Sequence, residues 1–178
     1  QKVLEEAPPP GISAELKRDI EQAAVRIVTH VKYSGVGTVE FLLKKNEFFF
    51  LEVNPRLQVE HGITEEITGI DLVQLQVKIA RGESIEDIEI RERGVAIEAR
   101  VCAEDTDQGV HPSPGKIVRF EPPLGPRVRI DSGVVTGTMV PPDFDSLVTK
   151  VIAIGDNRDG ARARLACVLQ DLELVIQG

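Results

Sequence analysis

Polar and apolar residues alternate without a break from Glu52 to Glu60. Successive side chains of an extended chain point to opposite faces, so this pattern predicts a strand about 27 Å long with one polar and one apolar face. Such a polar row could hold a metal ion and an oxyanion, although an edge strand with a solvated polar face fits the alternation equally well. The polar face would consist of Glu52, Asn54, Arg56, Gln58 and Glu60.

The residues before this stretch indicate a β-hairpin. Two β-prone runs, residues 36–44 and 48–54, are separated by a short polar turn. A three-residue turn places Glu40 directly opposite Glu52, whereas a two-residue turn puts the carboxylates on opposite faces and leaves them exposed. Like charges about 5 Å apart repel by roughly 3 kcal/mol at an effective dielectric constant of about 20, so the first register favours a cation between them. With Asn54, the two glutamates would form an all-oxygen set suited to Mg²⁺ or Mn²⁺ beside a nucleotide phosphate.

The rest of the pattern predicts an α+β fold. Apolar residues recur at helical spacing in four segments, and shorter β-prone runs separated by Pro/Gly turns follow a strongly charged stretch at 83–93. We expect two domains, residues 1–88 and residues 89–178, with the boundary in the charged stretch. The expected helices are 13–31, 64–68, 72–81 and 157–173, and the expected later strands are 95–102, 115–121, 127–131 and 147–154.

Composition narrows the class of protein. The chain has 178 residues and a net charge of −8, and it lacks interleaved basic and aromatic residues, which argues against nucleic-acid binding. No apolar run is long enough to span a membrane. Cys102 and Cys167 are too few for a disulfide framework, so we expect a reducing compartment, the cytoplasm or else the mitochondrial matrix. Because the chain begins without methionine and ends in what the pattern indicates is a turn, we expect a fragment of a longer polypeptide.

Four motifs closely resemble biotin carboxylase, the ATP-grasp component of biotin-dependent carboxylases. They are LEVNPRLQVEHGITEEITG (51–69), GVAIEARVCAED (94–105), PSPGKIVRF (112–120) and PPDFDSLVTKVIAIGDNRD (141–159). The resemblance covers nearly the whole chain. It implies the C-terminal half of an ATP-grasp domain, an antiparallel sheet with helices, followed by a biotin carboxylase C-terminal domain of short strands and a helix. Carbamoyl phosphate synthetase, a related ATP-grasp enzyme, shares the Glu-x-Asn-Pro-Arg element but is not expected to carry the later motifs.

The resemblance implies roles for residues of the hairpin. Glu40, Glu52 and Asn54 match the family's ligands for Mg²⁺ or Mn²⁺ on the ATP phosphates, and Glu40 and Glu52 thereby belong to the ATP site. Leu42 and Leu51 match apolar positions beside the adenine.

Further residues match the family's bicarbonate and biotin sites. Glu60 corresponds to the base that deprotonates bicarbonate, Val59 contributes backbone, and Arg100 corresponds to the arginine that holds the ureido oxygen of biotin. Bicarbonate is a poor nucleophile, so an aligned carboxylate and a cationic clamp lower the cost of its attack on the ATP γ-phosphate. Lys2 and Arg56 would supply the positive charges of this clamp, and Gln58 would help to hold the anion.

The implied reaction uses ATP and bicarbonate to carboxylate biotin on a carrier protein through carboxyphosphate. A carboxyltransferase is the implied further partner, and a homodimer is a further expectation because the family often dimerises. Pro55, Gly62 and Ile63 depart from the family pattern without removing a chemical group, although Gly62 would loosen the turn that positions Glu60. The family's amino-terminal domain and glycine-rich lid have no counterpart here, so we expect the chain alone to be inactive. A non-catalytic structural fragment and a different ATP-grasp ligase remain as alternatives.

Overall fold

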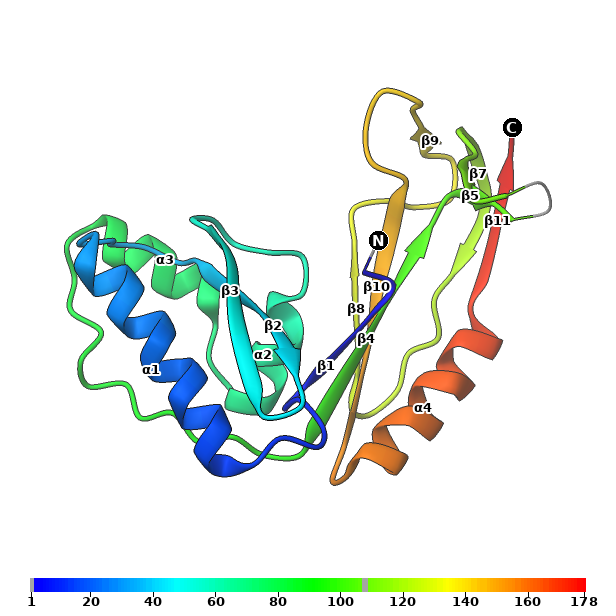
Figure 1. Cartoon of the computed structure of the whole chain (residues 1–178). Coiled ribbons are helices and arrows are strands. Elements are labelled where there is room, and N and C mark those ends of the chain that lie inside the picture. The colour runs from blue at the N-terminus through cyan, green and yellow to red at the C-terminus, as the bar shows by residue number, and fades with distance from the viewer. Residues whose placement is uncertain (1, 107–108) are drawn as a thin grey trace. The chain divides into compact units, whose positions relative to one another are not determined.

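A computed structural model describes residues 2–106 and 109–178 of the chain. By its internal contacts the chain divides into two compact units (Figure 1). One comprises Pro9–Arg91, and the other comprises the residues up to Pro8 together with Glu92–Gly178. These units differ from the predicted domains, 1–88 and 89–178, because the residues up to Pro8 join the later unit by their contacts. The domain boundaries themselves stay a prediction.

The Pro9–Arg91 unit contains three helices and a two-stranded hairpin among its described residues. Helix α1 (Ala14–His30) begins after Ser13, whose side chain accepts a hydrogen bond of 3.1 Å from the Leu16 amide and so satisfies one of the free N–H groups of the first turn. The hairpin and the two short helices follow it. Their bounds are β2 (Thr38–Lys44), β3 (Glu47–Asn54), α2 (His61–Thr68) and α3 (Leu72–Ala80).

An aromatic cluster joins the hairpin to α1. Phe41 of β2 lies 5.5 Å from Phe48 and 6.2 Å from Phe50 by ring centroids, in edge-to-face arrangements. These rings face a hollow of about 430 Å³ that Ala23 and Ile27 of α1 also line. The aromatic face of the hairpin is therefore its helix-facing side.

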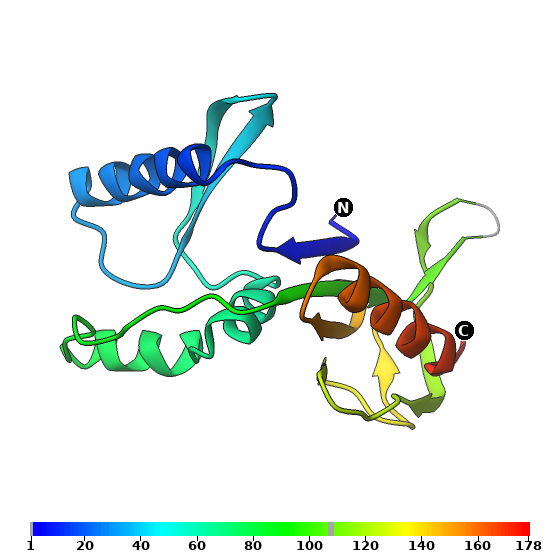
Figure 2. The same ribbon diagram turned by 90° about the horizontal axis from the view of Figure 1, so that it is seen from below.

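The other unit is built on a four-stranded antiparallel sheet with strand order β1-β4-β10-β8. Helix α4 (Arg158–Asp171) crosses one face of this sheet (Figure 2). Its residues Ala161, Leu165 and Val168 pack in the core cluster with Ile97 of β4 and Val151 of β10. The strands are β1 (Leu4–Ala7), β4 (Val95–Cys102), β8 (Val128–Ser132) and β10 (Leu147–Gly155).

A second, smaller sheet has the order β11-β7-β9. Ile117 of β7 and Val140 of β9 lie in its core with Ala103 and Val148. Its strands are β7 (Gly115–Glu121), β9 (Met139–Val140) and β11 (Glu173–Gln177), and β5 (Glu104–Asp105) pairs separately with β6 (His111–Pro112).

The α+β fold class is confirmed, and each of the four expected helices and the four later strands is present within a few residues. The C-terminal end was predicted wrongly. The last helix ends at Asp171, and Glu173–Gln177 form β11, which pairs antiparallel with β7. In the part of the chain that the structure describes, no helix is long and apolar enough to cross a membrane.

Candidate functional site

The hairpin places Glu40 directly opposite Glu52, as predicted, but by a different route. The turn has two residues rather than three, because Lys44 pairs with Glu47. A register shift between Glu40 and Phe41 then leaves Leu51 as an extra residue on β3. This bulge restores the opposition of the two glutamates, which the two-residue turn alone would have prevented.

Two side-chain amides connect the paired carboxylates. The Asn54 amide nitrogen donates to Glu52 Oε1 at 3.0 Å and to Glu40 Oε1 at 3.2 Å. The Gln58 amide nitrogen donates to the same Glu40 oxygen at 2.9 Å, and Gln58 is buried. Glu40, Glu52, Asn54 and Gln58, here called the carboxylate cluster, therefore converge on one small volume.

The expected strand from Glu52 to Glu60 is wrong beyond Asn54. The backbone N–H of Arg56 donates to the Asn54 carbonyl at 2.8 Å, which turns the chain immediately after β3. The His61 N–H donates to the Gln58 carbonyl, and Glu60 occupies the N-cap position of α2 with φ −78° and ψ 5°. Arg56, Gln58 and Glu60 consequently do not form an extended row.

The turn brings some of these residues to the cluster and leaves others out. Gln58 contacts Glu40, whereas Arg56 is exposed and its guanidinium donates to the Leu57 carbonyl at 3.3 Å. Val59 and Glu60 are half-buried. Leu42 and Leu51, the expected adenine neighbours, are 57% and 54% exposed, so their surfaces are open to a ligand.

His61 fixes the turn that follows the cluster. Its Nδ1 lies 2.7 Å from the Gln58 carbonyl oxygen, and its Nε2 lies 3.9 Å from Glu65 on the next turn of α2. A Glu65 oxygen in turn accepts from the Leu72 amide at 2.8 Å, at the start of α3. The histidine therefore helps to hold Gln58 where it meets Glu40.

The remaining predicted site residues, Lys2 and Arg100, belong to the other unit. Lys2 is exposed, and the Arg100 guanidinium lies 2.5 Å from Glu5 of β1. Arg100 therefore has an ion-pair partner on the neighbouring strand. Glu5 of β1 can reach Arg100 because Glu5 pairs opposite Glu98. Glu98 lies two residues before Arg100 on the same face of β4.

Around Arg100 lies a group of buried charges that the sequence did not reveal. Glu98 has no exposed surface, and Lys150 is 8% exposed. Burial raises the pKa of Glu98 to about 7, with the Lys150 charge opposing this shift and the Glu5 charge adding to it. Burial also acts to raise the pKa of Asp131, but a hydrogen bond and charge from Arg129 and the charge of Lys150 hold it below its usual value.

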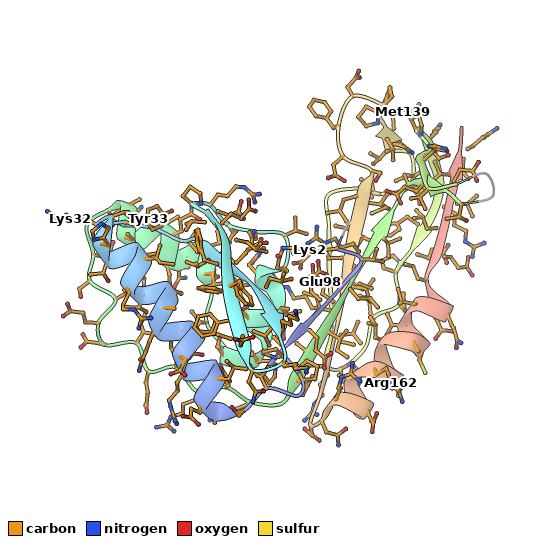
Figure 3. The ribbon with its side chains drawn as sticks, viewed as in Figure 1. Lys2, Lys32, Tyr33, Glu98, Met139 and Arg162 are labelled. Carbon is orange, nitrogen blue, oxygen red and sulfur yellow. The ribbon has the colours of Figure 1, made fainter. Side chains whose placement is uncertain are left out.

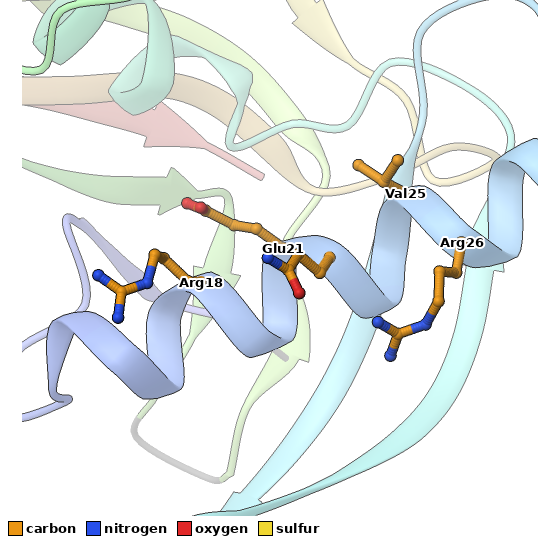
Figure 4. A pocket seen from close by; sticks show the side chains of 5 residues that line it. Arg18, Glu21, Val25 and Arg26 are labelled. Carbon is orange, nitrogen blue, oxygen red and sulfur yellow. The ribbon is translucent and has the colours of Figure 1, made fainter.

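Two surface hollows lie in the same unit as the carboxylate cluster. A hollow of about 490 Å³ is lined by five side chains of α1 alone (Figure 4), and neither it nor the hollow beside the phenylalanines is lined by the carboxylate cluster. Across the described ranges, no group of three or more His, Cys, Asp and Glu has the geometry of a metal site. The cluster offers two carboxylates and two amides instead, and their oxygens are the hard ligands that Mg²⁺ or Mn²⁺ accepts.

Two family models together match most of the chain. One, described as carbamoyl-phosphate synthase L chain, ATP binding domain, matches residues 1–88, and one described as biotin carboxylase C-terminal domain matches residues 98–178. The first match agrees with the ATP-binding character expected of the hairpin unit. The second match distinguishes the chain from a ligase that shares only the Glu-x-Asn-Pro-Arg element.

Similar proteins are named as biotin carboxylases or as other carboxylases. Biotin carboxylase from Nostoc sp. is 45% identical over 174 residues, covering 96% of this chain and 39% of the relative. The biotin-dependent acyl-coenzyme A carboxylase alpha3 subunit of Mycobacterium leprae is 47% identical over 176 residues, covering 98% of this chain and 29% of that protein. A solved single-chain, multi-domain long-chain acyl-CoA carboxylase superposes with a TM-score of 0.92 at 41% identity, over 98% of this chain and 20% of that one. The chain thus spans well under half the length of these relatives.

Proposed function

The chain belongs to the biotin carboxylase family as its C-terminal part, and on this premise we propose that it serves a longer protein that carboxylates biotin with ATP and bicarbonate. The reaction would pass through carboxyphosphate, and the biotin would be attached to a carrier protein. The observation that carries this proposal is the pairing of Glu40 with Glu52 through the amides of Asn54 and Gln58.

We assign Glu40, Glu52 and Asn54 to a Mg²⁺ or Mn²⁺ site. Two carboxylates held opposite each other repel, and a divalent cation between them would remove that repulsion. When bound, the cation would neutralise charge on the ATP phosphates. The Asn54 amide nitrogen donates to both carboxylates, and rotation of the side-chain amide by half a turn would present its oxygen to the cation instead. Leu42 and Leu51 would offer apolar surface to the adenine.

We assign the turn after β3 to bicarbonate. Arg56 and Gln58, with the Val59 backbone, would hold the anion, and Glu60 would take its proton. We also assign Lys2, a residue of the other unit, to bicarbonate. Because Gln58 already contacts Glu40, the bicarbonate would lie next to the carboxylate cluster that holds the metal. Electrostatic stabilisation of carboxyphosphate by fixed cations is the expected catalytic contribution.

We assign Arg100 to biotin. Carboxylation of the ureido nitrogen requires that nitrogen to lose its proton, which places negative charge on the ureido oxygen. A guanidinium held in place by Glu5 would stabilise that charge. The proposed catalytic residues are thus Arg56, Glu60 and Arg100. Arg56 would hold bicarbonate, Glu60 would take the bicarbonate proton, and Arg100 would hold biotin.

The proposed partners follow from this chemistry. The biotin must come from a carrier domain or protein, and a carboxyltransferase must take the carboxyl group onward. We also propose homodimerisation, and a reducing compartment such as the cytoplasm or mitochondrial matrix, for which the free state of Cys102 and Cys167 is the support.

Calorimetric titration of the chain with Mn²⁺, and with Mg-ADP plus bicarbonate, tests the proposal. Glu52→Gln should weaken Mn²⁺ binding by about tenfold or more, because it removes a charged ligand. Arg56→Ala should leave Mn²⁺ binding intact and abolish the bicarbonate-dependent heat. Glu47→Gln, which removes an exposed carboxylate from the same strand, is the matched control and should bind like the unmodified chain. Equal binding by all four proteins would favour a non-catalytic structural fragment.

A further inference from the structure

The face of the β1-β4-β10-β8 sheet opposite α4 carries charges on all four strands. The register places Glu5 opposite Glu98, and it places Lys150 opposite both Arg100 and Asp131. Partners in an antiparallel register share one face, so these side chains point the same way. With Arg129, they form a set here called the charged face: Glu5, Glu98, Arg100, Arg129, Asp131 and Lys150.

Glu98, labelled in Figure 3, is the fully buried member of the charged face. Within the described part of the chain, neither of its oxygens has a hydrogen-bond partner. The Lys150 ammonium lies 4.0 Å from Glu98 but 3.2 Å from Asp131. The Arg100 guanidinium lies 2.5 Å from Glu5. Both neighbouring cations are therefore engaged by other carboxylates.

A carboxylate in this position holds its proton more tightly than an ordinary glutamate does. Burial disfavours its charged form, and the nearby negative charges of Glu5 and Asp131 add to that effect, while Lys150 and Arg100 oppose it. The balance raises the pKa of Glu98 to about 7, so its proton is exchanged with water near neutral pH.

We propose that Glu98 is a positioning residue whose protonation state decides which carboxylate holds Arg100. With its proton, Glu98 leaves Arg100 paired with Glu5, in the orientation seen in the structure. Once the proton has left to bulk water, Glu98 lies one pleat away on the same face and competes with Glu5 for the guanidinium. The consequence for biotin, weaker engagement of the ureido oxygen above neutral pH, rests on the proposed function of Arg100.

The test follows the Arg100 side chain directly in the isotope-labelled chain. NMR titration from about pH 5.5 to 8.5 should show the Arg100 Nε–H resonance and the Glu98 carboxyl carbon moving together, with one midpoint near 7. In Glu98→Gln the Arg100 movement in this range should vanish. Glu121→Gln removes an exposed carboxylate of the same unit and should leave the midpoint unchanged. An Arg100 resonance that does not move, or that moves identically in Glu98→Gln, overturns the proposal.

Lys150→Met provides a second, independent readout. Loss of the cation that most favours ionised Glu98 should raise the common midpoint by roughly half a unit or more. An unchanged or lowered midpoint contradicts the proposal even if Glu98→Gln fails to fold. The NMR titrations contain no biotin, bicarbonate or nucleotide, so a negative result in them does not contradict the proposed function. In the same way, a negative result in the calorimetric titrations does not contradict the proposed role of Glu98.

Discussion

The chemistry of the hairpin depends on a few polar atoms. Glu40 and Glu52 lie opposite each other on neighbouring strands, an arrangement that costs free energy when both are ionised. The Asn54 and Gln58 amides offset part of this cost by donating hydrogen bonds to the carboxylate oxygens. Neutral donors do not cancel the two negative charges, so the cluster keeps a net attraction for a cation.

Glu98 makes the stability of its own unit depend on pH. Its pKa is about 7 in the folded chain against 4.5 for an ordinary glutamate, so folding binds the proton more tightly. The contribution of Glu98 to the free energy of unfolding is therefore full below about pH 4.5, falls as the pH rises, and is lost above about pH 7. Glu98→Gln removes this dependence, and we expect it to be more stable than the unmodified chain by about 2–3 kcal/mol at pH 8.

Urea denaturation at several pH values checks this expectation. Because the chain has no tryptophan, unfolding is best followed through the amide resonances of β4, on which Glu98 lies. The stability difference between variant and unmodified chain should shrink from pH 8 to pH 5. A difference that is constant with pH would mean that Glu98 titrates normally in the folded chain.

At the scale of elements, the hairpin shows what an alternating pattern can and cannot predict. The two strands and their turn follow from composition, and a polar face bearing Glu40 and Glu52 was expected. The bulge at Leu51 was not. Strict alternation along β3 would put Phe48 and Phe50 on the same face as Glu52, and only the extra residue separates the aromatic face from the acidic one. Nothing local in the sequence marks such a bulge, because packing against α1 selects it.

The row from Glu52 to Glu60 fails for a related reason. Alternation predicts an extended backbone only while a partner strand is present. Thr38, the first residue of β2, pairs with Asn54, so β2 offers no partner beyond this point. Beyond this point the backbone satisfies its hydrogen bonds locally, through Arg56 and His61, and proceeds into α2. The residue identities of the candidate site could thus be predicted, while their arrangement required the tertiary structure.

Helix caps allow the two units to be tested separately. Ser13 caps α1 in one unit, and the Asn157 side chain caps α4 in the other by accepting from the Gly160 amide at 2.9 Å. Replacement of either cap by alanine should cost about 1 kcal/mol, because one amide of the first turn loses its partner.

Hydrogen exchange of the backbone amides shows which unit loses stability in each variant. Ser13→Ala should speed exchange within Pro9–Arg91, and Asn157→Ala within the unit that contains α4. Ser34→Ala, at an exposed serine, is the control and should change neither. If each cap variant accelerated exchange equally in both units, the units would unfold as one cooperative body.

At the scale of the whole molecule, long-range pairing decides the organisation. β1 comes from the start of the chain yet joins the sheet of the later unit, where Glu6 also meets Arg158 of α4 at 2.8 Å. The sequence does not reveal this pairing, because pairing across about ninety residues leaves no local pattern. The burial of Glu98 and Lys150 was missed for the same reason, since it depends on the strand order.

The last prediction concerns activity. The chain spans 39–40% of the length of its bacterial biotin carboxylase relatives, and we expect an ATP site built from this part alone to be incomplete. Phosphoryl transfer depends on positioning and on exclusion of water, and a half-built site provides neither. We therefore expect the purified chain to bind Mn²⁺ through the carboxylate cluster but to show no bicarbonate-dependent ATP hydrolysis.

A coupled phosphate-release assay measures bicarbonate-dependent ATP hydrolysis by the chain and by its controls. Full-length biotin carboxylase 1 of Bacillus subtilis, 44% identical over 184 residues, is the positive control, and its segment matching this chain is the control for truncation. That segment should be as inactive as our chain. Bicarbonate-dependent hydrolysis by the chain, lost in Glu52→Gln, would instead show that the hairpin unit completes an ATP site without the remaining residues, and the proposal of an incomplete site would have to be abandoned.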